Sequence, residues 1–183
     1  KKFRQAIAYS VEKPTEKDRA ISPIAPNSWA FEDDVKTYDY DPQHGKNLLE
    51  DVTDEKDLEL TLHTLPELLD QAEKIKTDIE QNLNISTQIK VTNFIPNRNE
   101  FELFLGYGII PNDPDQYYFW HSTQQGNITG INDERIDNLL EKGRKTSDYQ
   151  ERTEIYQELQ KAILEEMPAI FLYYPTNYTV IRK

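Results

Sequence analysis

Residues 58–91 read LELTLHTLPELLDQAEKIKTDIEQNLNISTQIKV. The leucines of residues 58–62 alternate with polar residues, which is the pattern of a half-buried strand. After Pro66 in the chain, apolar residues recur at helical spacing, which predicts a helix. Asn84 is a suitable residue for the C-terminal end of this helix. The helical face consists of Leu68, Leu69, Ala72, Ile75, Ile79 and Leu83. Because Ile89 and Val91 mark a second strand, we predict a βαβ unit with parallel strands and an α/β fold.

Two helices are predicted before this unit. Apolar residues recur at helical spacing over residues 3–11, and a second helix begins at Asp41-Pro42 and runs through Leu49. A first residue that already lies at the edge of a helix is typical of a piece of a longer protein. We therefore expect residues 1–183 to be a single domain of a larger protein.

After this unit, residues 101–105 are apolar apart from Glu102 and predict a third strand. Residues 106–115, GYGIIPNDPD, follow it, and their glycines and prolines force an irregular path. A short helix is then predicted around residues 136–140, with Asn132 as its N-cap and Gly143 at its C-terminal end.

A longer helix is predicted to begin at Ser147 or Asp148 and to end before Pro168. Its buried face is expected to consist of Ile155, Tyr156, Leu159, Ala162, Ile163 and Met167. Residues 169–174 and 178–181 have the composition of strands.

Composition and charge exclude several classes of protein. The chain has 183 residues, 37% of them hydrophobic, and a net charge of −12, so a surface that binds nucleic acid through excess positive charge is not expected. It contains no apolar run of the roughly 18–20 residues that a membrane span requires. The absence of cysteine rules out disulfides, thiolate metal sites and a cysteine nucleophile.

Asp113, Asp115 and His121 contain the groups of an acid–base or metal cluster. However, Asp113-Pro114-Asp115 is also the pattern of a helix start, with a capping carboxylate followed by proline. We favour the capping interpretation. No catalytic triad, phosphate-binding loop or pair of metal ligands at helical spacing is present in the sequence, so neither a metal nor a cofactor is expected.

Aromatic residues gather around the irregular loop. They are Tyr107, Tyr117, Tyr118, Phe119 and Trp120. Aromatic side chains at a junction between a strand and a helix are typical of a ligand-binding surface in an open α/β sheet. Ordinary core packing is the alternative for at least two of them, and Phe119 is the first candidate for the core.

Several segments, taken in order, resemble the family 5 extracellular solute-binding proteins, the peptide, opine and nickel receptors of ABC importers. They are Phe3–Glu12, Ser22–Trp29, Tyr40-Asp41-Pro42, Lys46–Leu49, Gly106-Tyr107, Asp113–Asp115, Asn132 with Ile136–Leu140, and Arg152–Pro168. These segments extend over nearly the whole chain.

This resemblance implies that residues 1–183 are the second lobe of a two-lobed, type II periplasmic-binding-protein fold, with a mixed sheet flanked by helices. It further implies that the first lobe and a final return segment lie outside this sequence. Such receptors capture a solute between their lobes and deliver it to a permease driven by ATPase subunits. They act as monomers outside the cytoplasmic membrane, in the periplasm or as lipoproteins.

By the same resemblance, the loop after residue 105 faces the ligand, and Tyr107 stands where the family usually has a tryptophan. The expected ligand-binding residues are Trp29, Tyr107, Gly108, Ile110, Asn112, Asp113, Tyr117 and Trp120. Peptide-binding members hold the ammonium group of the peptide with an aspartate, and Ile110 occupies that place here. Either Asn112, Asp113 or another group replaces that aspartate, or the ligand is not a peptide with a free amino group.

The function predicted from the sequence is therefore that of a binding protein without enzymatic activity, with an oligopeptide as the first choice of ligand. An oligosaccharide or another non-peptide solute is the alternative. A hydrolase that uses Asp113 and Asp115 is a remote alternative, since acid–base catalysis needs two carboxyl groups with separated pKa values. An interaction domain without a working cleft is a third hypothesis.

Overall fold

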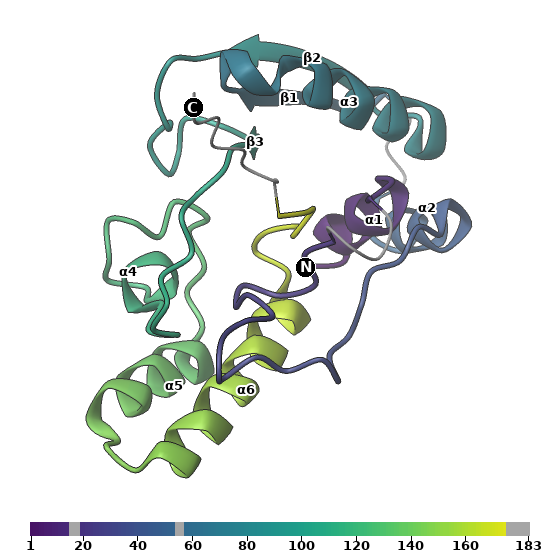
Figure 1. Ribbon diagram of the computed structural model, residues 1–183. Helices are drawn as coiled ribbons and strands as arrows, with labels where there is room; N and C mark the ends of the chain where they lie inside the picture. The colour runs from purple at the N-terminus through teal and green to yellow at the C-terminus, as the bar shows by residue number, and fades with distance from the viewer. Residues whose placement is uncertain (15–18, 54–56, 175–183) are drawn as a thin grey trace, which may run out of the picture.

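The computed structural model describes residues 1–14, 19–53 and 57–174. Three parallel strands form one sheet in this part of the chain, with β1 between β2 and β3 (Figure 1). The strands are β1 (Glu59–Thr64), β2 (Ser86–Val91) and β3 (Leu103–Leu105). In register, Leu62 lies beside Ile89 on one side and beside Leu103 on the other. The prediction of an α/β fold built on a βαβ unit is confirmed, although β3 is shorter than the predicted strand.

The crossover of this unit is a short 3-10 turn, η1 (Pro66–Leu68), followed by α3 (Leu69–Leu83). The helix ends as predicted, because Asn84 adopts the left-handed conformation with φ 55°. Ala72 of α3 packs with Leu62 and Leu105 against the sheet. The other side of α3 joins a second cluster with α1 (Lys2–Ser10) and α2 (Pro42–Glu50). Its buried members are Ala6, Ile7, Val11, Leu49, Ile79, Leu83 and Ile85.

A separate core lies among the helices of the C-terminal half, at the bottom of Figure 1. These helices are α4 (Tyr117–Trp120), α5 (Glu134–Lys145) and α6 (Tyr149–Glu166). Residues 22–31 pack against this core as a series of bends and turns. Gln160 fixes this segment by donating to the carbonyl of Ala30 at 2.8 Å and accepting from Ser22 Oγ at 2.9 Å. The buried members are Ile24, Ala30, Trp120, Ile136, Leu140, Tyr156, Leu159, Ala162 and Ile163.

Two details of α5 differ from the prediction. The N-cap is Asp133, whose Oδ1 accepts a hydrogen bond from the backbone of Ile136 at 3.0 Å, so the prediction of Asn132 is wrong by one residue. Gly143 lies inside the helix and does not end it. A Cβ atom at Gly143 would lie only 2.7 Å from the ring of Tyr156, so the glycine allows α5 and α6 to pack closely.

The long helix α6 follows the prediction at both ends. Asp148 caps it by accepting from the backbone of Glu151 at 2.9 Å, and the helix ends at Met167, which adopts a left-handed conformation with φ 49° before Pro168. The predicted strand over residues 169–174 is wrong, since only an isolated antiparallel bridge between Arg19 and Tyr173 forms there. The strand predicted for residues 178–181 lies outside the described residues.

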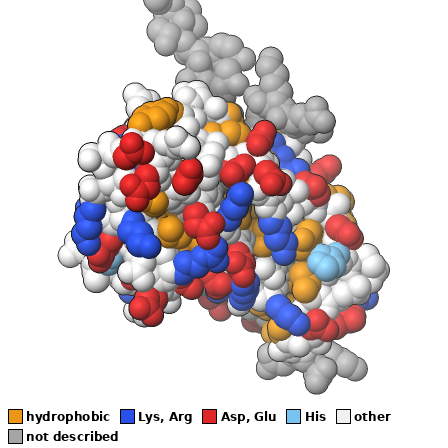
Figure 2. Space-filling model, turned by 90° about the horizontal axis from the view of Figure 1, so that it is seen from below, with side chains coloured by type: hydrophobic (Ala, Val, Ile, Leu, Met, Phe, Trp, Pro, Cys, Tyr) orange, Lys and Arg blue, Asp and Glu red, His pale blue; other side chains and the backbone are white. Residues whose placement is uncertain are grey.

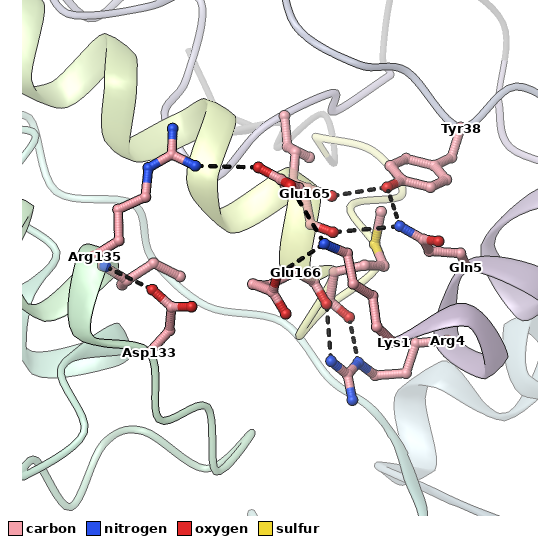
Figure 3. A network of polar contacts seen from close by, with 11 residues as sticks. Lys1, Arg4, Gln5, Tyr38, Asp133, Arg135, Glu165 and Glu166 are labelled. Carbon is pink, nitrogen blue, oxygen red and sulfur yellow. Dashed lines mark hydrogen bonds and ion pairs between the residues drawn. The ribbon is translucent and has the colours of Figure 1, made fainter.

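Polar contacts join α1 to the end of α6 (Figure 3). Arg4 donates to the carbonyls of Glu166 and Met167, both at 2.8 Å, and the ammonium of Lys1 lies 2.8 Å from the Glu166 carboxylate. Nearby, Gln5 donates to the hydroxyl of Tyr38, which in turn donates to a carbonyl of α6. The last carbonyls of α6 are therefore satisfied by side chains from the N-terminus.

Candidate ligand-binding site

The loop from Gly106 to Gln116 leaves the sheet at its C-terminal edge. Because β1, β2 and β3 are parallel, all three strands end at this edge, which is the usual place for a ligand in an open α/β sheet. Tyr107 follows β3 directly and is 61% exposed. Gly108, Ile110 and Asn112 are also exposed, so the structure places this group of predicted ligand-binding residues on one open loop.

Apolar side chains are exposed at the exits of two strands. Beyond β3, Ile109 is 90% exposed, and beyond β2, Phe94 and Ile95 are 67% and 56% exposed. Leu69, which follows the turn after β1, is exposed as well. A concentration of large exposed apolar residues is typical of a surface that binds a ligand or another protein domain.

The hydroxyl of Tyr107 is held by Glu67. It donates a hydrogen bond to Oε1 of Glu67 at 2.9 Å, and this bond to a carboxylate raises the pKa of the tyrosine. Glu67 belongs to η1, immediately after β1, so the contact joins the exits of two adjacent strands. Sequence reasoning missed Glu67, because Leu65-Pro66-Glu67 has the pattern of a helix start and gives no sign of a partner 40 residues away.

The two aspartates of the loop form ion pairs with the helices below. Asp113 accepts from both terminal nitrogens of Arg152 at 2.7 and 3.1 Å, and Asp115 accepts from Arg144 at 2.8 Å. The Arg152 guanidinium lowers the pKa of Asp113. The prediction of a helix start at Asp113-Pro114-Asp115 is wrong, because α4 begins at Tyr117 with Gln116 as its N-cap residue. Asp115 does accept a hydrogen bond from the backbone of Tyr117 at 3.0 Å.

Tyr117 and Trp120 are packed against other side chains. The ring of Tyr117 lies between His121, with a centroid distance of 4.2 Å, and the guanidinium of Arg144 at 4.0 Å. Trp120 is only 8% exposed and donates from Nε1 to Gln116 at 2.6 Å. The prediction that Phe119 is the core residue of this group is wrong, since Phe119 is 38% exposed and Trp120 takes that place.

Trp29 is also half-buried and lies apart from the exposed loop residues. Its ring packs beside Tyr149 and Tyr156 of α6, and the guanidinium of Arg152 lies 5.3 Å from its centroid. Arg152 therefore contacts both Trp29 and Asp113. The predicted site residues separate into an exposed set, Tyr107, Gly108, Ile110 and Asn112, and a packed set, Trp29, Tyr117 and Trp120. Asp113 is exposed but is held by its ion pair with Arg152.

Other features of the described residues do not point to a second site. A hollow of about 320 Å³ lies beside α3, and its lining contains no residue of the loop 106–116. Within residues 1–14, 19–53 and 57–174, no group of three or more His, Cys, Asp or Glu side chains could hold a metal ion. No helix in this part of the chain is long and apolar enough to cross a membrane. Acidic and basic side chains are interspersed on the face seen in Figure 2.

Known proteins with similar sequences bind peptides. The chain is 24% identical to the dipeptide-binding protein of Escherichia coli over 210 residues, a match that covers all of this chain. It is 25% identical to the oligopeptide-binding protein AppA of Bacillus subtilis, over 97% of its length. These similarities agree with the resemblance to the family 5 extracellular solute-binding proteins. It spans 39% of the length of each of these two relatives, and no model of a protein family matches it.

Solved structures of similar proteins have the same fold. The ABC transporter substrate-binding protein CtaP of Listeria monocytogenes superimposes with a TM-score of 0.85 at 25% identity, over 94% of this chain and 40% of CtaP. NikZ of Campylobacter jejuni, solved in complex with Ni(L-His), has a TM-score of 0.80 at 26% identity, over 94% of this chain and 41% of NikZ. The resemblance read from the sequence is thus confirmed as a similarity in sequence and in fold.

Proposed function

We propose that the chain is one lobe of the substrate-binding component of an ABC importer, and that this component captures an oligopeptide for delivery to a permease driven by ATPase subunits. The observation that carries the proposal is the match of the whole chain to a part of two peptide-binding proteins. In the proposed arrangement, a second lobe faces the C-terminal edge of the sheet, and the ligand lies between the two. The protein works as a monomer outside the cytoplasmic membrane.

The surface chemistry of the exposed loop supports this role. Tyr107, Ile109 and Ile110 offer an aromatic ring and apolar side chains to a ligand, and the open backbone at Gly108 leaves room for close approach. No chemical step on the ligand is proposed. Both aspartates considered for hydrolysis are engaged with arginines, which leaves neither of them as a free acid or base.

A second candidate is a non-peptide solute. It is favoured by the likeness to NikZ, whose structure contains a nickel complex of histidine. Closure of two lobes around a ligand would proceed in the same way for either solute.

Calorimetric titration of the natural protein tests both candidates. Separate pools of short peptides, oligosaccharides and Ni(II)–L-histidine are added, and amide chemical shifts of residues 105–120 locate the contact. Binding of peptides alone, with shifts at Tyr107, is the expected result. Binding of only one of the other pools would replace the peptide with that class of solute, and a response to none would contradict the receptor role.

A further inference from the structure

The carboxylates of Glu67, Asp113 and Asp115 have different partners. Asp113 is paired with Arg152, and Asp115 is paired with Arg144. Glu67 accepts only the hydroxyl of Tyr107, a neutral donor, and within the described part of the chain it takes part in no ion pair. Glu67 therefore carries a negative charge that no described cation balances, at the edge where the strands end.

The contact with Tyr107 orients both groups. The hydroxyl of Tyr107 donates to Glu67, and this bond holds the carboxylate at the hydroxyl end of the ring. The tyrosine itself remains largely exposed. An oriented carboxylate beside an exposed aromatic face is a favourable environment for an ammonium group, which bonds to the oxygen and is attracted to the ring. Ile109 and Ile110 of the same loop are exposed apolar side chains.

We propose that Glu67, positioned by Tyr107, binds an ammonium group of the ligand. This inference rests on the proposed function and adds a determinant of specificity to it. It also explains how a ligand with a positive charge could be accepted although Ile110 provides no charge and Asp113 is already engaged by Arg152.

The alternative role for Glu67 is purely structural. An acidic residue in the turn that leads into α3 stabilises the positive end of the helix dipole. That role requires neither the bond to Tyr107 nor any ligand. A substitution that keeps the shape and removes the charge therefore separates the two roles, provided that binding and stability are both measured.

The experiment compares three tripeptides by calorimetry on the natural protein that contains these 183 residues. Ala-Ala-Ala carries only an N-terminal ammonium, acetyl-Ala-Lys-Ala carries only a side-chain ammonium, and acetyl-Ala-Ala-Ala carries neither. They are titrated into the wild type and the variants Glu67→Gln and Tyr107→Phe. Glu59→Gln serves as a matched control, because Glu59 is exposed on the same strand–helix unit but at the opposite end of β1.

Glu67→Gln is expected to weaken one or both ammonium peptides by about tenfold to a hundredfold, the usual worth of a charge-assisted hydrogen bond. Acetyl-Ala-Ala-Ala should bind the wild type more weakly and should not respond to the substitution. The affected peptide identifies whether the ammonium comes from the N-terminus or from lysine. Tyr107→Phe should produce a smaller loss in the same direction, and Glu59→Gln should change nothing.

Equal binding of all three peptides to the wild type and Glu67→Gln would overturn the role of Glu67 while leaving the peptide-binding function in place. A uniform loss for all three peptides, together with a lower melting temperature, would also overturn it in favour of the structural role. Failure of the wild type to bind any of the peptides would contradict both the proposed function and this assignment.

Discussion

The side chain of Lys13 is partly buried. Its ammonium donates to the carbonyls of Ala8 and of Val11, the latter at 2.9 Å. Burial, together with the nearby positive charge of Arg19, lowers its pKa from 10.5 to about 8. Between these two pKa values the unfolded chain binds more protons than the folded one, so the free energy of unfolding rises with pH in this window.

We therefore expect stability to increase from pH 8 to pH 10, as measured by urea denaturation, and to increase much less in Lys13→Met. Above pH 10 the raised pKa values of tyrosines such as Tyr38 and Tyr156 act in the opposite sense, since the folded state then holds the extra protons. Lys46→Met, at an exposed position of α2, is the control and should keep the wild-type slope. Equal slopes in all three proteins would contradict the burial of charge at Lys13.

For single residues, the sequence predicts which ones lie on the exposed loop, but it does not predict their partners. The loop after residue 105 was identified from its glycines, prolines and aromatics, and Tyr107 does lie exposed on it. The partners of its charged groups could not be identified, because Asp113 and Arg152 are 39 residues apart and only the packing of the loop on α6 brings them together. Phe119 and Trp120 were assigned the wrong way round because α4 is a single turn, too short to have a periodic pattern.

At the level of elements, the helices α2, α5 and α6 each begin with one capping aspartate. The cap of α5 is Asp133, which accepts the backbone N–H of Ile136, whereas the neighbouring Asn132 is exposed. Asp133→Ala is expected to lower the free energy of unfolding by about 1 kcal/mol.

Asn132→Ala is the matched control and should change stability by less than about 0.5 kcal/mol, as is usual for exposed positions away from caps. Thermal denaturation of the two variants beside the wild type measures the difference. A larger loss in Asn132→Ala than in Asp133→Ala would place the helix start where the sequence had predicted it.

The elements with a strong period were predictable and the others were not. The βαβ unit follows from alternating leucines and from an apolar face along a helix of 15 residues, and both features depend only on local sequence. The helix α5 was predicted to stop at Gly143 because glycine commonly ends helices. Its actual reason is contact with Tyr156 from another helix, which no local pattern reveals.

At the level of the whole molecule, the N-terminal helix is joined to the C-terminal half by Arg4. Its guanidinium satisfies two backbone carbonyls at the end of α6, where the chain turns through a left-handed residue. Arg4→Met keeps the aliphatic stem and removes both bonds. We expect it to lower the free energy of unfolding by about 1–3 kcal/mol, since hydrogen bonds from charged groups are lost.

Lys2→Met provides the comparison. Lys2 makes an exposed ion pair with Asp51 at 3.0 Å, and its removal should cost less than about 1 kcal/mol. Chemical denaturation of both variants checks the difference. If the two losses were equal, the link between the two ends of the described chain would be no stronger than an ordinary surface ion pair.

Side-chain contacts hold the loop from Gly106 to Gln116 near both of its ends. Tyr107 is tied to Glu67 after β1, and the pairs of Asp113 and Asp115 with Arg152 and Arg144 tie it to the helices. The five residues between these anchors, 108–112, are exposed and make no contribution to either core. Natural variation can therefore exchange them without loss of folding, so in the proposed receptor a handful of substitutions can change the ligand preference while the scaffold stays the same.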